Sequence, residues 1–295
     1  MFGKNSNPVF QTLENQMHLA PTGVKMVRKG SSMTDSIWRQ ETGEGPLVAV
    51  ALHDGHEVRA DLSEAMLVSP GGRRREEDPC TGEWAEVAPT RLIGTRSRFE
   101  VDLNRAREEA VYLTPEDAWG IQVWKQPLRE GQVKRSLDEY DLFYRELKTL
   151  LAGIERKHGA FFVFDLHNYN HRREGPDGPP ADPEGNPEVN IGTGTLDRAF
   201  WAPVVERFIK DLRAFDFLGR QLDVRENVKF VGRGFPRFVH THFPKTGCAI
   251  AIEFKKFFMD ECTGAVDPLQ HEAIKAALRS TVHGVLDGLE EVRQA

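Results

Sequence analysis

Three apolar runs of the chain each lead directly into polar residues. They open the segments LVAVALHDGHE (47–57), FFVFDLHNYN (161–170) and CAIAIEFKK (248–256). Continuous Val, Ala, Ile and Phe stretches of this length are typical of strands buried on both faces of a parallel sheet. Ligands of open α/β sheets bind outside the carboxyl ends of the strands. The histidines and the glutamate at these ends therefore predict a metal site with a general base.

Helical patterns separate the apolar runs. Ser136 and Glu139 form a capping-box pattern, and apolar residues then recur every three or four positions up to Gly159, which predicts a helix over 136–158. A second helix is predicted over 197–215, and a last one begins at Asp267-Pro268. Segments 70–90 and 172–190 have the Gly, Pro and charge content of loops. Strands that alternate with helices indicate an α/β fold with a mixed, mostly parallel sheet.

The length and composition suit one large domain. Residues 1–45 are polar and weakly periodic, so we expect an irregular N-terminal extension that packs on a single domain over 46–295. Hydrophobic residues make up 39% of the chain, which is enough to supply a core. The net charge of −6 gives no reason to expect a nucleic-acid partner.

The same sequence gives expectations about location. No apolar run reaches the roughly 20 residues that a membrane span requires, and the N-terminus lacks the apolar core of a signal peptide. Cys80, Cys248 and Cys262 are widely spaced and odd in number, so a disulfide framework is not expected. These features favour the reducing cytoplasm.

The segment His53-Asp54-Gly55-His56-Glu57 concentrates metal-binding side chains after the first strand. Gly55 permits a tight turn, so a ligand three residues after His53 could face the same ion. Zinc binds histidine nitrogen and carboxylate oxygen, and catalytic sites hold it with three protein ligands. A strand-to-loop junction that uses His and Asp only for capping explains the segment equally well.

His167 closes the second strand in the same way. Strand alternation places Asp165 on the face of His167, where the carboxylate could orient the imidazole. A lone buried histidine is normally structural, but the matching position of His53 favours a metal ligand. His240 and His242 are a competing pair if they lie on a strand, although hydrogen bonding at a loop edge is the simpler interpretation.

Glu253 follows the third apolar run. A carboxylate is costly to bury there unless it is paired or lies near a metal. It could take a proton from water and deliver it to a leaving amine. The alternative is an ion pair with Lys255, Lys256 or an arginine.

The segment TRSRFEVDLNR (95–105) is rich in arginine. Arg98 and Arg105 could hold a substrate carboxylate in bidentate fashion. Surface arginines on a solvated strand are the alternative, but Asp102 and Asn104 beside Arg105 favour an oriented guanidinium.

Together these segments resemble the N-formylglutamate amidohydrolase family. The resemblance is carried by SRFEVDLNR (97–105), the His53-Asp54-Gly55 loop and Asp165-Leu166-His167-Asn168, and it spans roughly residues 47–260 in the family's motif order. More distantly, the arrangement is similar to zinc carboxypeptidases and aspartoacylases. The resemblance implies a three-layer α/β/α fold of the phosphorylase/hydrolase type and one zinc ion.

The resemblance also implies roles for individual residues. It makes His53 and His167 metal ligands and Glu253 the general base. It implies Asn104 and Arg105 as the clamp for the substrate, to which we add Arg98, Arg96, Asn168 and Tyr169 as candidates for substrate binding. The third metal ligand stays open, because His56 stands where the peptidases have Glu, and the formylglutamate enzymes use an acidic residue further downstream. The candidates are His56, Glu57, Glu77 and Asp78.

Three functions are compatible with these residues. The first is a zinc amidohydrolase that cleaves a small N-acyl, N-formyl-like amino acid. The second is a carboxypeptidase that acts on small peptides with the same residues. The third is a degenerate domain that binds a ligand or partner without turnover, an alternative that stays open because His56 stands in place of Glu.

Overall fold

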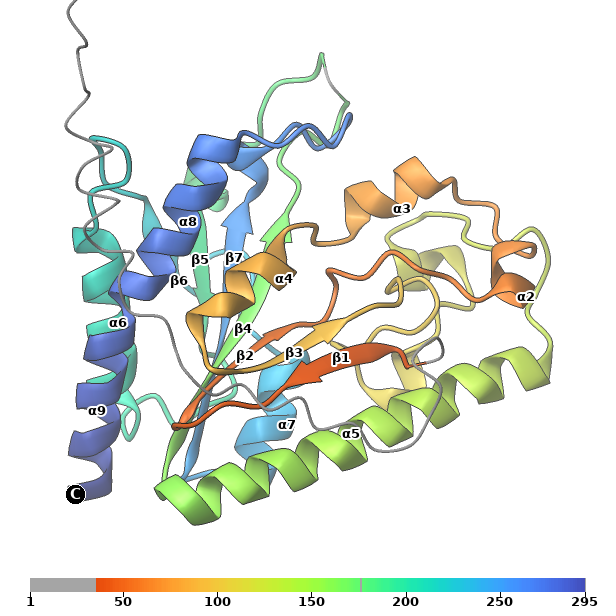
Figure 1. Ribbon diagram of the computed structural model, residues 1–295. Helices are drawn as coiled ribbons and strands as arrows, with labels where there is room; N and C mark the ends of the chain where they lie inside the picture. The colour runs from red at the N-terminus through yellow and green to blue at the C-terminus, as the bar shows by residue number, and fades with distance from the viewer. Residues whose placement is uncertain (1–35, 176, 295) are drawn as a thin grey trace, which may run out of the picture.

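A mixed β-sheet runs through the middle of the molecule. The computed structural model describes residues 36–175 and 177–294, and within them the strands form a 7-stranded sheet in the order β1-β3-β2-β4-β7-β5-β6 (Figure 1). The strands are β1 (Trp38–Glu41), β2 (Leu47–Ala51), β3 (Thr90–Gly94), β4 (Phe161–Tyr169), β5 (Val189–Gly192), β6 (Val224–Glu226) and β7 (Gly247–Lys255). The neighbours β3, β2, β4 and β7 are parallel, whereas β1 and β5 run antiparallel to β3 and β7.

Helices cover both faces of this sheet. The helices are α2 (Ala60–Ser63), α3 (Pro70–Glu76), α4 (Thr81–Trp84), α5 (Glu130–His158), α6 (Ala202–Ala214), α7 (Gly234–His242), α8 (Pro268–Ser280) and α9 (Val282–Gln294). One core cluster joins α4, α6, α8 and α9 to one face, and another joins α5 and α7 to the opposite face (Figure 1). The expected three-layer α/β fold with a mixed, mostly parallel sheet is therefore confirmed. Among the described residues, no helix has both the length and the apolarity that crossing a membrane would need.

The three apolar runs identified in the sequence form neighbouring central strands. β2, β4 and β7 lie side by side, and every residue of β2 and β4 is buried. In the parallel register of β4 and β7, His167 pairs with Glu253. The polar residues that follow the apolar runs therefore meet at one edge of the sheet.

A smaller core lies beside that edge. It is built from Leu62, Met66, Phe99, Tyr112, Ala118, Val123 and Trp124. These residues belong to the segment between β2 and α5, which includes α2 and α3 on the right of Figure 1. The segment contains the arginine-rich stretch 95–105, so its packing determines where those arginines lie relative to the strand ends.

Two helices begin at positions other than those predicted. α5 begins at Glu130 rather than Ser136, because the Gln132 side chain accepts a hydrogen bond from the backbone N–H of Arg129 at 3.0 Å. Ser136 is buried instead, and its hydroxyl accepts a hydrogen bond of 2.8 Å from Arg59. α6 begins at Ala202, and the residues before it from 197 form turns.

Other segments are more regular than the sequence predicted. The supposed loop 70–90 contains α3, which Ser69 caps through the N–H of Gly72, as well as α4. The single final helix is divided at Thr281 into α8 and α9. Residues 38–41 of the expected irregular extension form the edge strand β1. The division into an extension over 1–45 and a domain over 46–295 stays a prediction, since residues 1–35 lie outside the described residues.

Candidate metal centre and active site

Three buried side chains converge at the carboxyl edge of the central strands. His53 follows β2, His167 lies in β4, and Asp78 lies between α3 and α4. One ligand atom of each lies within 4.8 Å of the others, and the Nδ1 atoms of His53 and His167 are 3.2 and 2.9 Å from Asp78 Oδ2. Two imidazole nitrogens and one carboxylate are donors that zinc favours in catalytic sites. The residues present therefore fit a divalent metal ion.

Each imidazole also contacts a further carboxylate through its other ring nitrogen. Asp102 Oδ1 lies 2.6 Å from Nε2 of His53, and Asp165 Oδ1 lies 3.0 Å from Nε2 of His167. Without a metal ion, Nδ1 of each histidine can donate to Asp78. With a metal ion bound, the ring proton would lie on Nε2 in both histidines, and each Nδ1 would direct its lone pair toward the ion. Metal-binding histidines are typically oriented by such a carboxylate.

Hydrogen bonds and nearby positive charges keep the carboxylates of Asp78 and Asp102 ionised. Burial alone would raise the pKa of Asp78, but hydrogen bonds from His167 and His53 outweigh it and hold that pKa well below its usual range. Burial is likewise overcome at Asp102, where the charges of Arg98 and His53 keep the pKa well below its usual value. Asp78 is therefore ionised, as a carboxylate that binds a metal ion must be.

Among the four candidates for the third ligand, the structure brings Asp78 to the two histidines. Its backbone N–H donates to the carbonyl oxygen of His53 at 2.9 Å, which holds it beside the strand end. His56 and Glu77 contact each other instead, with 2.5 Å between Nδ1 and Oε2, and Glu77 also accepts a hydrogen bond from Ser97. Neither these two nor Glu57 belongs to the converging group.

Glu253 faces a small cavity next to the cluster. The cavity has a volume of about 180 Å³ and is lined by His53, Glu76, Asp78, Arg98, Asn104, Trp119, His167, Asn168, Tyr169, Asn170, Arg173, Phe230, Glu253 and Lys256. Burial, together with the charges of Asp78 and Asp165, outweighs the charge of His167 and raises the pKa of Glu253 to about 7.

The expected alternative for Glu253 was an ion pair. Lys255 and Lys256 donate to backbone carbonyl oxygens instead. Among the described residues, the Glu253 carboxylate has no hydrogen bond or ion pair. It is therefore free to exchange a proton with a molecule in the cavity.

The arginines of segment 95–105 are anchored by Asp102. Arg98 donates to Asp102 Oδ2 at 2.9 Å and to the Tyr112 hydroxyl at 3.2 Å, and that hydroxyl donates to the same carboxylate oxygen. Arg105 Nε lies 3.7 Å from Asp102. Both guanidiniums stack on aromatic rings, Arg98 on Trp119 and Arg105 on Tyr112, at 4.8 and 4.6 Å from the ring centroids. Of the two, Arg98 lines the cavity.

Asn104 and Asn168 also line the cavity. The Asn104 side chain accepts a hydrogen bond from the N–H of Phe235 at 2.6 Å, and its nitrogen lies 3.3 Å from His167 Nε2. Asn168 donates to the carbonyl oxygen of Pro79 at 2.8 Å, which leaves its own buried carbonyl oxygen without a partner among the described residues. That oxygen is a candidate acceptor for a ligand.

The two other expected substrate residues lie differently. The Tyr169 hydroxyl donates to the carbonyl oxygen of Pro187, and its ring contacts Phe230 at the cavity wall. The positive charge of Arg96 partly offsets the increase that burial causes in the pKa of Glu100 and of Glu139. Arg96 is not among the residues that line the cavity.

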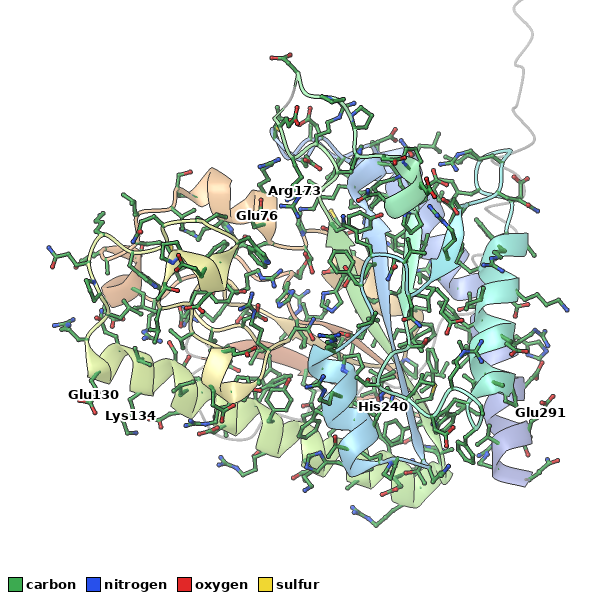
Figure 2. All side chains as sticks on the ribbon, turned by 180° about the vertical axis from the view of Figure 1, so that it is seen from behind. Glu76, Glu130, Lys134, Arg173, His240 and Glu291 are labelled. Carbon is green, nitrogen blue, oxygen red and sulfur yellow. The ribbon has the colours of Figure 1, made fainter. Side chains whose placement is uncertain are left out.

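Several residues that line the cavity were not predicted from the sequence. Trp119 is half exposed and has a positive φ of 55°, which is rare for a bulky side chain. Arg173 and Glu76 approach each other across the cavity mouth at 3.3 Å (Figure 2). Arg173 lies in a segment whose composition indicated only a surface loop, so no local pattern distinguished it.

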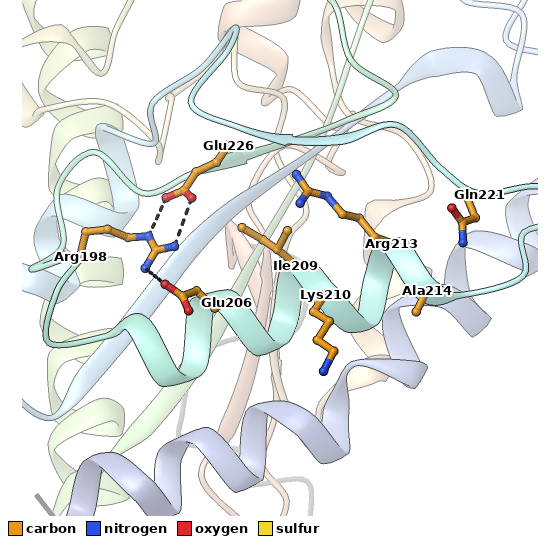
Figure 3. A pocket seen from close by; sticks show the side chains of 8 residues that line it. All are labelled: Arg198, Glu206, Ile209, Lys210, Arg213, Ala214, Gln221 and Glu226. Atoms are coloured by element: carbon orange, nitrogen blue, oxygen red, sulfur yellow. Dashed lines mark hydrogen bonds and ion pairs between the residues drawn. The ribbon is translucent and has the colours of Figure 1, made fainter.

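Other candidate sites carry less chemistry. A hollow of about 470 Å³ beside α6 is lined by charged residues, but Arg198 there is already paired with Glu226 and Glu206 (Figure 3). His240 lies on α7 rather than on a strand (Figure 2), and its Nε2 accepts the N–H of Ala249 at 3.1 Å. It is a structural histidine.

The comparison with protein families identifies the chain. The model of the N-formylglutamate amidohydrolase family matches residues 45–259. The chain belongs to this family. It is accordingly a hydrolase of amide bonds, as the sequence predicted. A comparison with curated proteins finds no match.

Two solved structures of similar fold support the assignment of the architecture. An N-formylglutamate amidohydrolase from Ralstonia eutropha JMP134 is 18% identical, with a TM-score of 0.65 over 88% of this chain and 99% of that one. A gene product from Agrobacterium tumefaciens is 14% identical, with a TM-score of 0.56 over 85% of this chain and 96% of that one. A metallo-carboxypeptidase from Pseudomonas aeruginosa is a weaker match, with 12% identity and a TM-score of 0.40 over 95% of this chain and 68% of that one.

The role of Asp102 leads to a stability prediction. Asp102→Asn removes a buried charge that faces Arg98, so we expect it to lower the free energy of unfolding by about 3–5 kcal/mol, measured by urea denaturation of the metal-free protein. Asp141→Asn is the matched control, because Asp141 pairs with Arg107 on the surface and should contribute little. Equal losses in the two variants would contradict the assigned role of Asp102.

Proposed function

We propose that the chain is a zinc-dependent amidohydrolase that cleaves the amide of a small N-acyl, N-formyl-like amino acid. The observation that carries the proposal is the convergence of His53 Nδ1, His167 Nδ1 and the Asp78 carboxylate beside the unpaired Glu253. Family membership supplies the reaction class, and this geometry supports the metal dependence.

In the proposed mechanism, His53, His167 and Asp78 hold the metal ion. A bound zinc ion supplies a Lewis acid that activates water and polarises the scissile carbonyl. Asp102 and Asp165 keep the two imidazoles in the tautomer and orientation that direct Nδ1 inward.

Glu253 acts as the proton shuttle. Its carboxylate takes a proton from the attacking water and passes it to the departing nitrogen, so that the amine leaves as a neutral group. A pKa of about 7 suits both steps, since general acid–base catalysis is most efficient when the pKa of the group lies near the working pH. Its place opposite His167 across the β4–β7 register keeps it next to a candidate metal ligand.

The arginines recognise the substrate carboxylate. Arg98 has N–H groups left beyond those that it donates to Asp102, Tyr112 and the carbonyl oxygen of Glu76, and it lines the cavity together with Asn104 and Asn168. Arg105 adds positive charge from behind, stacked on the ring of Tyr112. A cavity of about 180 Å³ favours an amino-acid-sized substrate over an extended peptide.

Location and partners remain predictions. We propose a small-molecule substrate and a cytoplasmic location, which is consistent with free thiols at Cys80, Cys248 and Cys262.

Metal dependence gives the first test. Exhaustive chelation should abolish hydrolysis of an N-formyl amino acid, and stoichiometric zinc should restore it. Asp78→Ala should lose both zinc and activity, whereas His56→Ala, a change at a rejected ligand candidate, should retain both.

The substrate panel distinguishes the alternatives. N-formyl, N-acetyl and dipeptide substrates are compared under the same conditions. Preference for dipeptides would indicate a carboxypeptidase, and bound zinc without turnover of any substrate would indicate a binding domain. Hydrolysis that survives metal removal contradicts the proposal.

A separate prediction concerns Glu253. Glu253→Gln keeps the size of the side chain but cannot accept a proton, so kcat should fall by roughly 10²–10⁴-fold with zinc content unchanged. Glu226→Gln, at the hollow beside α6, is the control and should leave kcat unaltered. Near-normal kcat in Glu253→Gln would remove this residue from the mechanism.

A further inference from the structure

A single peptide group connects the third candidate ligand to two central strands. The backbone N–H of Asp78 donates to the carbonyl oxygen of His53 at 2.9 Å. The carbonyl of the same peptide group, which belongs to Glu77, accepts a hydrogen bond of 2.9 Å from Nζ of Lys256. The peptide plane before Asp78 is therefore held from the end of β2 on one side and from the end of β7 on the other.

Lys256 makes this contact from a buried position. It directly follows β7, is only 1% exposed, and donates a second hydrogen bond of 2.5 Å to the carbonyl oxygen of Arg75. Both acceptor carbonyls lie at the C-terminal end of α3, where a cation interacts favourably with the exposed carbonyl groups.

The contact replaces an ordinary ion pair. Among the described residues, Lys256 forms no salt bridge with a carboxylate. Burying an ammonium group is costly unless its donors are satisfied, and two of the three donors are satisfied here by carbonyl oxygens next to Asp78. The hydrogen bonds that stabilise this buried charge therefore also fix one short stretch of backbone.

We propose that Lys256 is a positioning residue for Asp78, and that it sets metal affinity by fixing the Glu77–Asp78 peptide group. The inference rests on the proposed metal centre. Asp78 is the only member of the converging group that lies outside the sheet and its immediate strand ends, so its carboxylate needs a separate anchor. Lys256 supplies that anchor from the position directly after the strand that carries Glu253, and thereby couples the position of the ligand to that of the proton shuttle.

Lys256 also lines the cavity, so direct contact with substrate is the competing role. The two roles affect different quantities. A positioning residue changes the affinity for zinc alone, in the absence of substrate. A substrate-binding residue changes KM and leaves zinc affinity unaltered.

The test compares Lys256→Met with Lys255→Met. Lys255 is the matched control because it precedes Lys256 directly and also donates to a backbone carbonyl, that of Asn186, away from the metal cluster. Zinc affinity is measured by competition with a chromogenic chelator, alongside urea denaturation of the metal-free proteins and steady-state kinetics. We expect zinc affinity to fall by about 10–100-fold in Lys256→Met, as for other residues that orient metal ligands, and to stay unchanged in Lys255→Met.

The outcomes separate the inference from the proposed function. If the unaltered protein binds one zinc per chain and Lys256→Met binds it equally well, the positioning role is wrong while the metal centre stands. If the unaltered protein binds no zinc, the proposed function itself fails. Should Lys256→Met not fold, Lys256→Leu, which also removes the donor, takes its place, and an unaltered affinity would again overturn the inference.

Discussion

The site depends on one buried carboxylate, that of Asp102. Its Oδ1 accepts hydrogen bonds from His53 Nε2 and the backbone N–H of Asn104. Its Oδ2 accepts hydrogen bonds from Arg98 and the hydroxyl of Tyr112. An ionised group without solvent contact is stable only when it is paired and fully hydrogen-bonded. These bonds fix a candidate metal ligand and a candidate substrate-binding arginine relative to the same carboxylate, so the candidate metal centre and the candidate substrate site share one rigid support.

The central strands explain why the site lies where it does. β2, β4 and β7 are parallel neighbours, so the polar residues after each apolar run meet at one edge. This much could be predicted from sequence, because strand period, apolar composition and the carboxyl-end rule are local or topological properties. His53, His167 and Glu253 were found for that reason, and the register that pairs His167 with Glu253 gives them adjacent positions.

The remaining parts of the site depend on contacts between distant segments. Asp78 is held beside the histidines by its hydrogen bond to the backbone of His53, whereas Glu77 contacts His56 and Ser97. Ser136 lies inside α5 and accepts a hydrogen bond from Arg59 of another segment instead of capping the helix. Lys256 had been considered only as a partner for Glu253, whereas it anchors the C-terminal end of α3. Local patterns cannot show which of several nearby polar residues a long-range contact selects, so the third ligand stayed open in the sequence.

The candidate metal centre is tested most directly by an anomalous-scattering map of zinc-loaded crystals, recorded on both sides of the zinc absorption edge. We expect one strong peak per chain at bonding distance, about 2.0–2.2 Å, from Nδ1 of His53, Nδ1 of His167 and the carboxylate of Asp78. A peak bound instead by His56 and Glu77, or no peak at saturating zinc, would contradict it.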